Sequence, residues 1–252
     1  MVNKISVTIL TKNSQKYIKE CLQVLCGFDE IILLDNGSSD KTLTIAKQFK
    51  NVKIFENKFI GFGALKNLAI HYATNDWILS VDSDEILSKE LVNEILNIKL
   101  ENNTIYSILR ENYYNKQKIK CCGWQNDWVN RLFNKKHTHF NNKKVHESLI
   151  IHNNTKLKKL HYTFKHYSFE GVSQLLLKMD TYSTLYAQEH KGKKLSSPSK
   201  ALFRSITSFI KNYFFQKGFL YGYEGLLISI SNANGVFYKY MKLYEENKNH
   251  DL

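Results

Sequence analysis

The chain has 252 residues, 43% of them hydrophobic, which is enough to bury the core of one domain with a large appendage. No apolar run of about 18 residues occurs, so the sequence predicts no membrane span. The first residues lead straight into a strand-like run, which argues against a signal peptide. The four cysteines lack zinc-site spacing, and we expect reduced thiols in a cytoplasmic protein.

The net charge of +13 is unevenly distributed along the chain. Residues 1–90 carry eleven lysines and eleven acidic residues, whereas residues 91–252 carry 25 Lys and Arg against 12 acids. A basic, aromatic-rich segment such as residues 91–252 can bind nucleic acid, anionic lipid or a phosphorylated substrate. An AT-rich genome that favours Lys and Asn is the alternative explanation for part of the bias.

The first hundred residues alternate strand-like runs with helical periodicity. The predicted strands are 5–10, 30–34, 52–55 and 77–81. Apolar residues at helical spacing predict helices near 18–25, 43–49, 65–72 and 91–96. This rhythm with short connections predicts an α/β fold with a mostly parallel sheet and helices on both faces.

After about residue 104 the rhythm changes to short strands and then to long helices. The predicted strands are 105–110, 118–122, 129–133 and 160–167. Helical stripes follow at 172–186, 202–213 and 226–244, the first two separated by Pro198.

Polar clusters follow three of the predicted strands, and ligands of such sheets bind beyond the carboxyl ends of the strands. The clusters are 11–13, 35–40 and 82–85. Strand alternation predicts that Asp82 and Asp84 point the same way, where a hard ion such as Mg²⁺ or Mn²⁺ would relieve their repulsion. An Asp-x-Asp pair alone also fits a solvated acidic turn, but three converging clusters favour a site.

These motifs resemble the family 2 glycosyltransferases with the GT-A fold, and among them the bacterial lipopolysaccharide-core glucosyltransferase group. The residues that carry the resemblance span nearly the whole chain: Thr11-Lys12-Asn13, Asp35 to Asp40, Gly61-Phe62-Gly63 with Lys66-Asn67, Asp76-Trp77, Asp82 to Glu85, Gly123-Trp124, Arg131-Leu132-Phe133, His146-Glu147, His166-Tyr167, Lys217-Gly218-Phe219 and Phe237 to Tyr240. Many members have a carboxylate where this chain has Asn36.

The resemblance implies inverting transfer of a hexose, glucose being expected, from a nucleotide diphosphate sugar such as UDP-glucose. The implied acceptor is a lipopolysaccharide inner-core or lipid-linked glycan. The implied organisation is a nucleotide-sugar-binding half (1–100), an acceptor-side part of the same GT-A domain (101–168) and a C-terminal helical extension (169–252).

The same resemblance assigns roles to particular residues. Nucleotide-sugar binding is expected from Thr11, Asn13, Asp35, Asn36, Asp40, Lys66, Asp82 and Ser83. A divalent metal on Asp82 and Asp84 would stabilise the leaving diphosphate. Glu147 is the expected general base, with Asp127 as the alternative.

Further contacts to phosphate or acceptor are expected from Arg131, His146, His166 and Lys178, although each also fits an ordinary structural role. Lysine and arginine interleave with phenylalanine between residues 200 and 217, a mixture that suits the surface of an anionic membrane. We therefore expect a cytoplasmic enzyme peripheral to the inner face of the bacterial inner membrane.

Three other functions compete with this interpretation. A basic nucleic-acid-binding module would explain the charge, but no zinc spacing or RNA-recognition signature is present, so no nucleic-acid partner is expected. A nucleotidyltransferase would need a Gly-rich, basic N-terminal loop, which residues 11–14 do not provide. A degenerate, binding-only domain is disfavoured by the intact Asp82 and Asp84 pair.

Overall fold

The computed structural model describes residues 2–143 and 147–248. The chain forms two compact units. The first comprises Met1–Glu111 and Asp127–His166, and the second comprises Asn112–Asn126 and Tyr167–Leu252. The candidate site residues lie mainly in the first unit.

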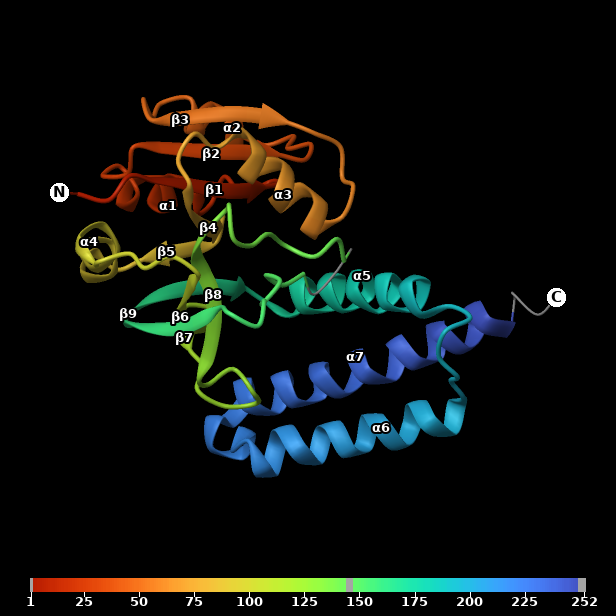
Figure 1. The fold of residues 1–252 in the computed structure, drawn as a ribbon. Helices are drawn as coiled ribbons and strands as arrows, with labels where there is room; N and C mark the ends of the chain where they lie inside the picture. Colours follow the sequence, from red (N-terminus) through yellow and green to blue (C-terminus); the bar gives the residue numbers. More distant parts are fainter. Residues whose placement is uncertain (1, 144–146, 249–252) are drawn as a thin grey trace. The chain divides into compact units, whose positions relative to one another are not determined.

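A parallel sheet forms the N-terminal half of the first unit (Figure 1). Its strands pair in the order β3-β2-β1-β4. They are β1 (Ile5–Thr11), β2 (Glu30–Asp35), β3 (Val52–Glu56) and β4 (Trp77–Asp82). Every residue of β2 is buried, as its continuous apolar run predicts for a strand covered on both faces.

Beyond β4 the sheet becomes antiparallel. β8 (Asp127–Asn134) pairs with β4, and β6 (Thr104–Tyr114), β9 (Lys156–Phe169) and β5 (Glu85–Leu87) continue the order. The α/β class is therefore confirmed, and the sheet is mixed, with its parallel part in β1 to β4. The predicted strand at 118–122 is reduced to β7 (Gln117–Lys118), and β5 was not predicted because three residues carry too little periodicity.

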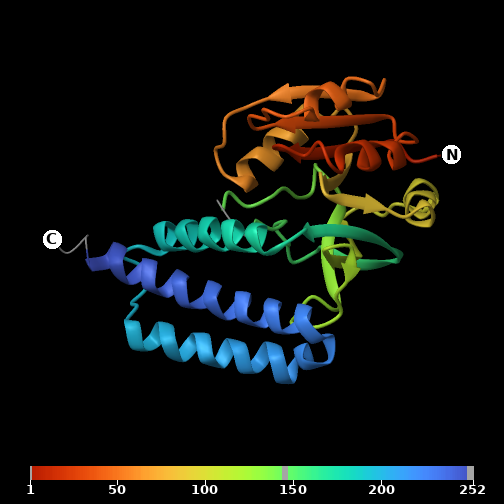
Figure 2. The same ribbon diagram turned by 180° about the vertical axis from the view of Figure 1, so that it is seen from behind.

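Helices cover both faces of the parallel strands. They are α1 (Ile18–Val24), α2 (Thr42–Ala46) and α3 (Phe62–Tyr72), and α4 (Lys89–Asn97) follows β5. α3 packs on β1 and β2, and the two opposed views show α1 and α2 on the other face (Figures 1 and 2).

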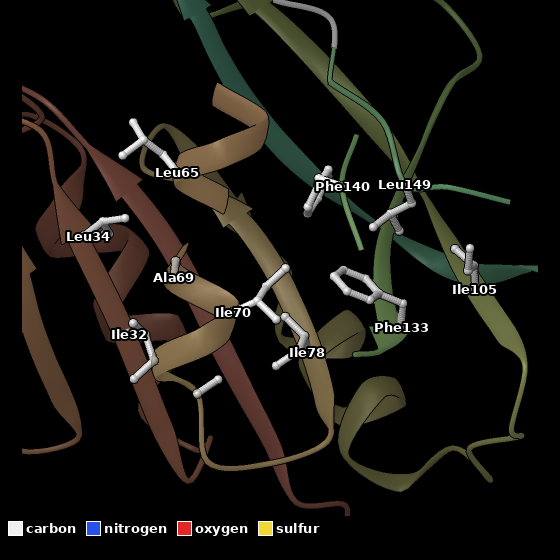
Figure 3. Packing of buried hydrophobic residues seen from close by; sticks show 11 residues of the cluster. Ile32, Leu34, Leu65, Ala69, Ile70, Ile78, Ile105, Phe133, Phe140 and Leu149 are labelled. Carbon is white, nitrogen blue, oxygen red and sulfur yellow. The ribbon is translucent and has the colours of Figure 1, made fainter. Parts of the chain in front are cut away.

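The core beneath α3 combines strand and helix residues that are far apart in sequence (Figure 3). Ile32 and Leu34 project from one face of β2 and meet Leu65 and Ala69 of α3. Phe133 and Phe140 extend the same cluster towards the antiparallel strands. This packing fixes α3, and with it Lys66, over the strand ends.

The second unit is mainly helical. It contains α5 (Val172–His190), α6 (Pro198–Ile210), a π-helical turn η1 (Lys211–Phe215), a 3₁₀ turn η2 (Gly218–Tyr221) and α7 (Gly222–Lys248). α7 packs against α5 and against α6, and lies between them (Figures 1 and 2). None of the helices in the described residues is long and apolar enough to cross a membrane.

A buried carboxylate ties the amino ends of the sheet strands together. Glu30 accepts hydrogen bonds from Ser6, Lys53 and Thr74, the Lys53 contact measuring 2.8 Å. Burial alone would raise the pKa of Glu30, but these hydrogen bonds lower it to about 2.

Because the pKa of Glu30 is lower in the folded chain, its stabilisation is present above the unfolded value near 4.5 and is lost as the pH falls towards 2. We expect Glu30→Gln to reduce the free energy of unfolding at pH 7 by about 1–3 kcal/mol. The difference from wild type should shrink between pH 5 and pH 3 in urea unfolding. Exposed Glu56→Gln is the control, and an equal pH dependence in both variants would contradict the assignment.

Candidate active site

Three polar clusters meet at the carboxyl edge of the parallel sheet. Thr11 is opposite Asp35 in the register of β1 and β2, and Leu10 is opposite Asp82 in the register of β1 and β4. The strand ends that the sequence singled out are therefore neighbours in space.

The loop after β2 is built around the carboxylate of Asp35. One oxygen accepts from the hydroxyls of Thr11 (2.9 Å) and Ser38 (2.5 Å), and the other accepts from the backbone N–H groups of Gly37 and Ser38. Burial opposes ionisation, but these four hydrogen bonds lower the pKa of Asp35. Asp35 is consequently an anchor that shapes the loop.

Asn13 and Asp40 cross-link the loops after β1 and β2. Asn13 accepts from the backbone N–H of Ser39, and its own N–H donates to Ser38. Asp40 accepts from the N–H groups of Gln15 and Thr42, which secures the start of α2. Both residues hold the shape of the predicted nucleotide loop.

Ser83 and Asn36 face the same loops. The hydroxyl of Ser83 lies 2.7 Å from that of Ser14, which links the acidic turn to the loop after β1. The side-chain oxygen of Asn36 is buried, and no described residue donates a hydrogen bond to it. A buried acceptor in that position is costly unless a ligand supplies a donor.

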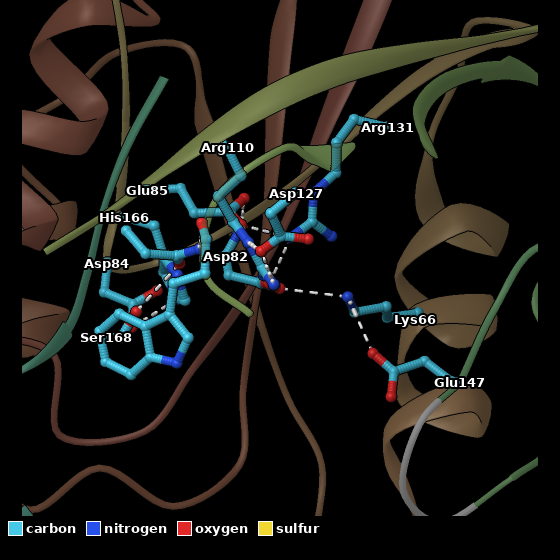
Figure 4. A network of polar contacts seen from close by, with 12 residues as sticks. Lys66, Asp82, Asp84, Glu85, Arg110, Asp127, Arg131, Glu147, His166 and Ser168 are labelled. Carbon is cyan, nitrogen blue, oxygen red and sulfur yellow. Dashed lines mark hydrogen bonds and ion pairs between the residues drawn. The ribbon is translucent and has the colours of Figure 1, made fainter. Parts of the chain in front are cut away.

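Asp82 is held by two cations (Figure 4). One oxygen is 3.1 Å from Nζ of Lys66, and the other is 2.6 Å from a guanidinium nitrogen of Arg131. Burial alone would raise the pKa of Asp82, but Arg131 and Lys66 hold it well below its usual range.

Arg131 also pairs with Glu85, which is almost completely buried. A second oxygen of Glu85 accepts from the backbone N–H of Asp82 at 3.0 Å. Burial raises the pKa of Glu85, while Arg131 opposes that rise. The guanidinium thus joins the end of β4 to the start of β5.

Asp84 lies on the other side of this turn from the Lys66 contact. β4 ends at Asp82, and Ser83 and Asp84 form a turn, so strand alternation does not extend to Asp84. Figure 4 shows Asp82 directed towards Lys66 and Asp84 towards His166. β5 pairs Glu85 with His166 of β9, which leaves Nε2 of His166 3.5 Å from a carboxylate oxygen of Asp84.

Lys66 connects the acidic turn to Glu147. Its buried Nζ is 3.0 Å from Oε1 of Glu147 as well as 3.1 Å from Asp82. α3 can approach the chain segment before Glu147 because residue 63 is glycine. A Cβ on Gly63 would lie 1.9 Å from the backbone oxygen of Asn141.

The remaining predicted residues fall into three groups. Asp127 is paired with Arg110 across β6 and β8, at 2.8 Å, and is partly buried. Lys178 lies on α5 in the second unit, with Nζ 4.7 Å from the centre of the Phe169 ring. His146 lies outside the described residues.

Sequence reasoning missed Glu85 and Arg110 as members of the charge cluster. Glu85 was visible as the last acid of the run 82–85, but only its pairing with buried Arg131 makes it structural. Arg110 is 3.8 Å from Glu85 and bonds Asp127, contacts that follow from the register of β6 and β8.

Comparisons with known proteins agree on the class. Residues 6–153 match the profile described as glycosyl transferase family 2. An uncharacterized glycosyltransferase of Rickettsia typhi is 32% identical over 259 residues, covering 97% of this chain and 88% of that protein. One of Rickettsia felis is 33% identical over 263 residues, covering 97% and 90%.

The solved structure of Staphylococcus aureus TarS residues 1–349 in complex with UDP-GlcNAc has a similar fold. Its TM-score is 0.51 at 15% identity, covering 98% of this chain and 90% of that one. The chain thus has a GT-A-type fold. The chain belongs to glycosyl transferase family 2. Membership of this family favours a glycosyltransferase over a nucleic-acid-binding module or a nucleotidyltransferase.

Removing Arg131 should leave buried Glu85 without its close cation and Asp82 with Lys66 alone. We expect Arg131→Gln to lower the free energy of unfolding by about 3–5 kcal/mol at pH 7.5, because an uncompensated buried charge is costly. The loss should diminish at pH 5, where protonation relieves it. Urea unfolding measures both. Lys136→Gln, which breaks only the exposed pair with Asp76, should cost less than about 1 kcal/mol, and equal losses would refute the role of Arg131.

Proposed function

We propose that this glycosyltransferase moves a hexosyl group, glucose in the first instance, from a nucleotide diphosphate sugar to a lipopolysaccharide inner-core or related glycan acceptor, with inversion. The observation that carries the proposal is the charge cluster at the end of β4, adjacent to the Thr11–Asp35 loop. Transfer chemistry needs a nucleotide pocket next to a strongly charged diphosphate site, and these are neighbouring strand ends.

The nucleobase would be recognised by the loop after β2. The four hydrogen bonds to Asp35 already come from within the chain, so Asp35 is better suited to shaping the pocket than to reading a base. The buried side-chain oxygen of Asn36 is an acceptor suited to an N–H donor such as that of uracil. TarS, which shares the fold, was solved with UDP-GlcNAc, and a uridine donor is accordingly the first to test.

A divalent metal fits the charge balance of the cluster. Five carboxylates face three permanent cations: Asp82, Asp84, Glu85, Asp127 and Glu147 against Lys66, Arg110 and Arg131. An anionic diphosphate would add to this negative excess unless a cation accompanied it.

Asp84 would hold the ion through a carboxylate oxygen, the ligand type that Mg²⁺ and Mn²⁺ prefer, whereas two cations compete for the oxygens of Asp82. His166 would be the second ligand, and its imidazole nitrogen suits Mn²⁺ better than Mg²⁺. Two protein ligands leave positions for phosphate oxygens and water. When bound, the ion would supply Lewis-acid stabilisation of the leaving diphosphate. Among the described residues no set of three or more acidic, His or Cys side chains is grouped for metal binding, which suits an ion completed by the donor.

Glu147 is the proposed general base, taking the proton of the acceptor hydroxyl. Lys66 holds one carboxylate oxygen of Glu147 and so fixes the side chain beside the acidic turn. Asp127 is the alternative, but Arg110 binds it through two guanidinium nitrogens at 2.8 Å. Both nitrogens bind the same oxygen of Asp127, and this arginine pair holds that oxygen more firmly than the single lysine contact at 3.0 Å holds Glu147.

The proposed acceptor is lipid-linked, which would place the enzyme at the inner face of the bacterial inner membrane. Support comes from the basic, aromatic composition of the C-terminal helices.

A panel of nucleotide sugars, each with and without Mn²⁺ or Mg²⁺, tests the donor and the metal together. We expect UDP-glucose with Mn²⁺ to raise the melting temperature and UDP-glucose alone to raise it less. Asp84→Asn should abolish the metal-dependent part, and Asp76→Asn, an exposed acid of the same unit, should retain it. No thermal shift with any nucleotide sugar would refute the donor class. An unchanged metal effect in Asp84→Asn would remove Asp84 from the metal site.

Replacing Glu147 tests whether this side chain acts as the general base or contributes to donor binding. Glu147→Gln retains an oxygen that can accept from Lys66, so donor affinity should stay near wild type while turnover falls by about 10²–10⁴. Asp127→Asn, measured in parallel, should have a smaller effect on kcat. The reverse order of effects would transfer the role to Asp127.

A further inference from the structure

α6 exposes an apolar face that no described part of the second unit covers. Leu202, Phe203, Ile206 and Ile210 are between 41% and 67% exposed, and the stripe continues into η1 with Phe214 and Phe215, which are 55% and 80% exposed. At about 100° per residue, the four α6 side chains fall within an arc of about 100°. Exposed clusters of this size mark an interaction surface.

The opposite face of α6 packs on α7. Ala201 is fully buried there, and the hydroxyl of Ser205 donates to the backbone oxygen of Ala233 at 2.9 Å. The stripe is therefore an outward-facing surface of this unit and is not required for the contact between the two helices.

One flank of α6, between these two faces, is basic. By the same helical geometry Lys200, Arg204 and Lys211 project there, together with the hydroxyl of Thr207. From residue 190 to residue 223 the chain has seven Lys and Arg and no Asp or Glu. An apolar face bordered only by cations is the pattern of a helix lying in a membrane interface.

The same flank opens into a cavity of about 430 Å³ within the second unit. Its polar lining includes Arg204, Lys211 and Lys239, the hydroxyls of Thr207 and Ser208, and Tyr240. No carboxylate lines it, and within the described residues none forms an ion pair with these three cations. Three cations with hydroxyl donors match a phosphate group.

From these observations we infer that α6 docks on an anionic phospholipid leaflet. The apolar stripe enters the acyl boundary, and the cavity beside it holds a lipid phosphate. A second copy of the chain is a poorer occupant, because a symmetric contact would bring two basic flanks together. The inference deepens the proposed function. It rests on that function only for the role of the contact, which would be to bring the enzyme to a lipid-linked acceptor.

Sedimentation with vesicles tests the inference without donor or acceptor, so its outcome is independent of the transfer reaction. We expect the full chain to bind vesicles of phosphatidylcholine and phosphatidylglycerol in equal amounts, to bind phosphatidylcholine alone weakly, and to be released by salt. Arg204→Gln with Lys211→Gln should weaken the partition coefficient about tenfold or more, since each cation contributes roughly fivefold. Phe203→Ser with Ile206→Ser should weaken it by at least as much.

Matched controls distinguish these side chains from general charge and hydrophobicity. Leu176→Ser with Leu177→Ser alters two equally exposed residues of α5, and Lys47→Gln with Lys50→Gln removes two exposed charges of the first unit. Both should bind like wild type, and all variants should melt cooperatively in solution. Equal losses in the controls would overturn the assignment to α6.

Two other results would also overturn the inference. One is a dimer in light scattering that Phe203→Ser with Ile206→Ser disperses, with no vesicle binding, which would assign the face to a second copy. The other is thermal stabilisation by inorganic phosphate, lost in the Arg204 and Lys211 variant, without vesicle binding. That result would assign the cavity to a free phosphate compound.

Discussion

Buried Arg131 is the interaction on which the site depends. It comes from β8 and bonds Asp82 at the end of β4 and Glu85 at the start of β5, so one guanidinium fixes three strands at the ligand edge of the sheet. Buried ion pairs contribute little net stability compared with packed apolar residues, because desolvation offsets their attraction. The benefit is positional: the turn carrying Ser83 and Asp84 is held between two anchored carboxylates.

The approach of α3 supplies the second constraint. Lys66 reaches Asp82 because the core under α3 fixes that helix on β1 and β2. It reaches Glu147 because Gly63 allows the backbone at Asn141 to lie against the helix. Gly63 has no reactive side chain, but the close approach that it allows lets Lys66 contact both the proposed base, Glu147, and Asp82 of the acidic turn.

Sequence reasoning predicted the parts of the site that depend on local pattern. The runs before Thr11, Asp35 and Asp82 specify parallel strands, and parallel strands place their carboxyl ends side by side. Sequence reasoning could not predict which acidic side chain pairs with which basic side chain. The contact of Asp84 with His166 requires β5, three residues long, to pair with a strand some eighty residues later, and the partners of Arg131 require the register of β8 on β4. The register between two strands that are distant in sequence produces no periodic pattern within either strand, so the sequence of each strand alone does not reveal it.

The positive charge of the C-terminal part could come from a compositional bias of the genome or from a functional requirement, and its distribution along the chain bears on this question. Lysine is about equally frequent in residues 1–90, with 11, and in residues 91–252, with 22, so the uneven charge comes mainly from the acids, of which 11 lie in the shorter first part and 12 in the second. The 34 residues from 190 to 223 contain seven cations and no acid, and they coincide with α6, η1 and η2, where large apolar side chains are exposed. Codon bias acts on composition and not on which face of a helix is basic. The coincidence of acid depletion with apolar exposure on one helix fits the proposed contact with an anionic, partly apolar partner.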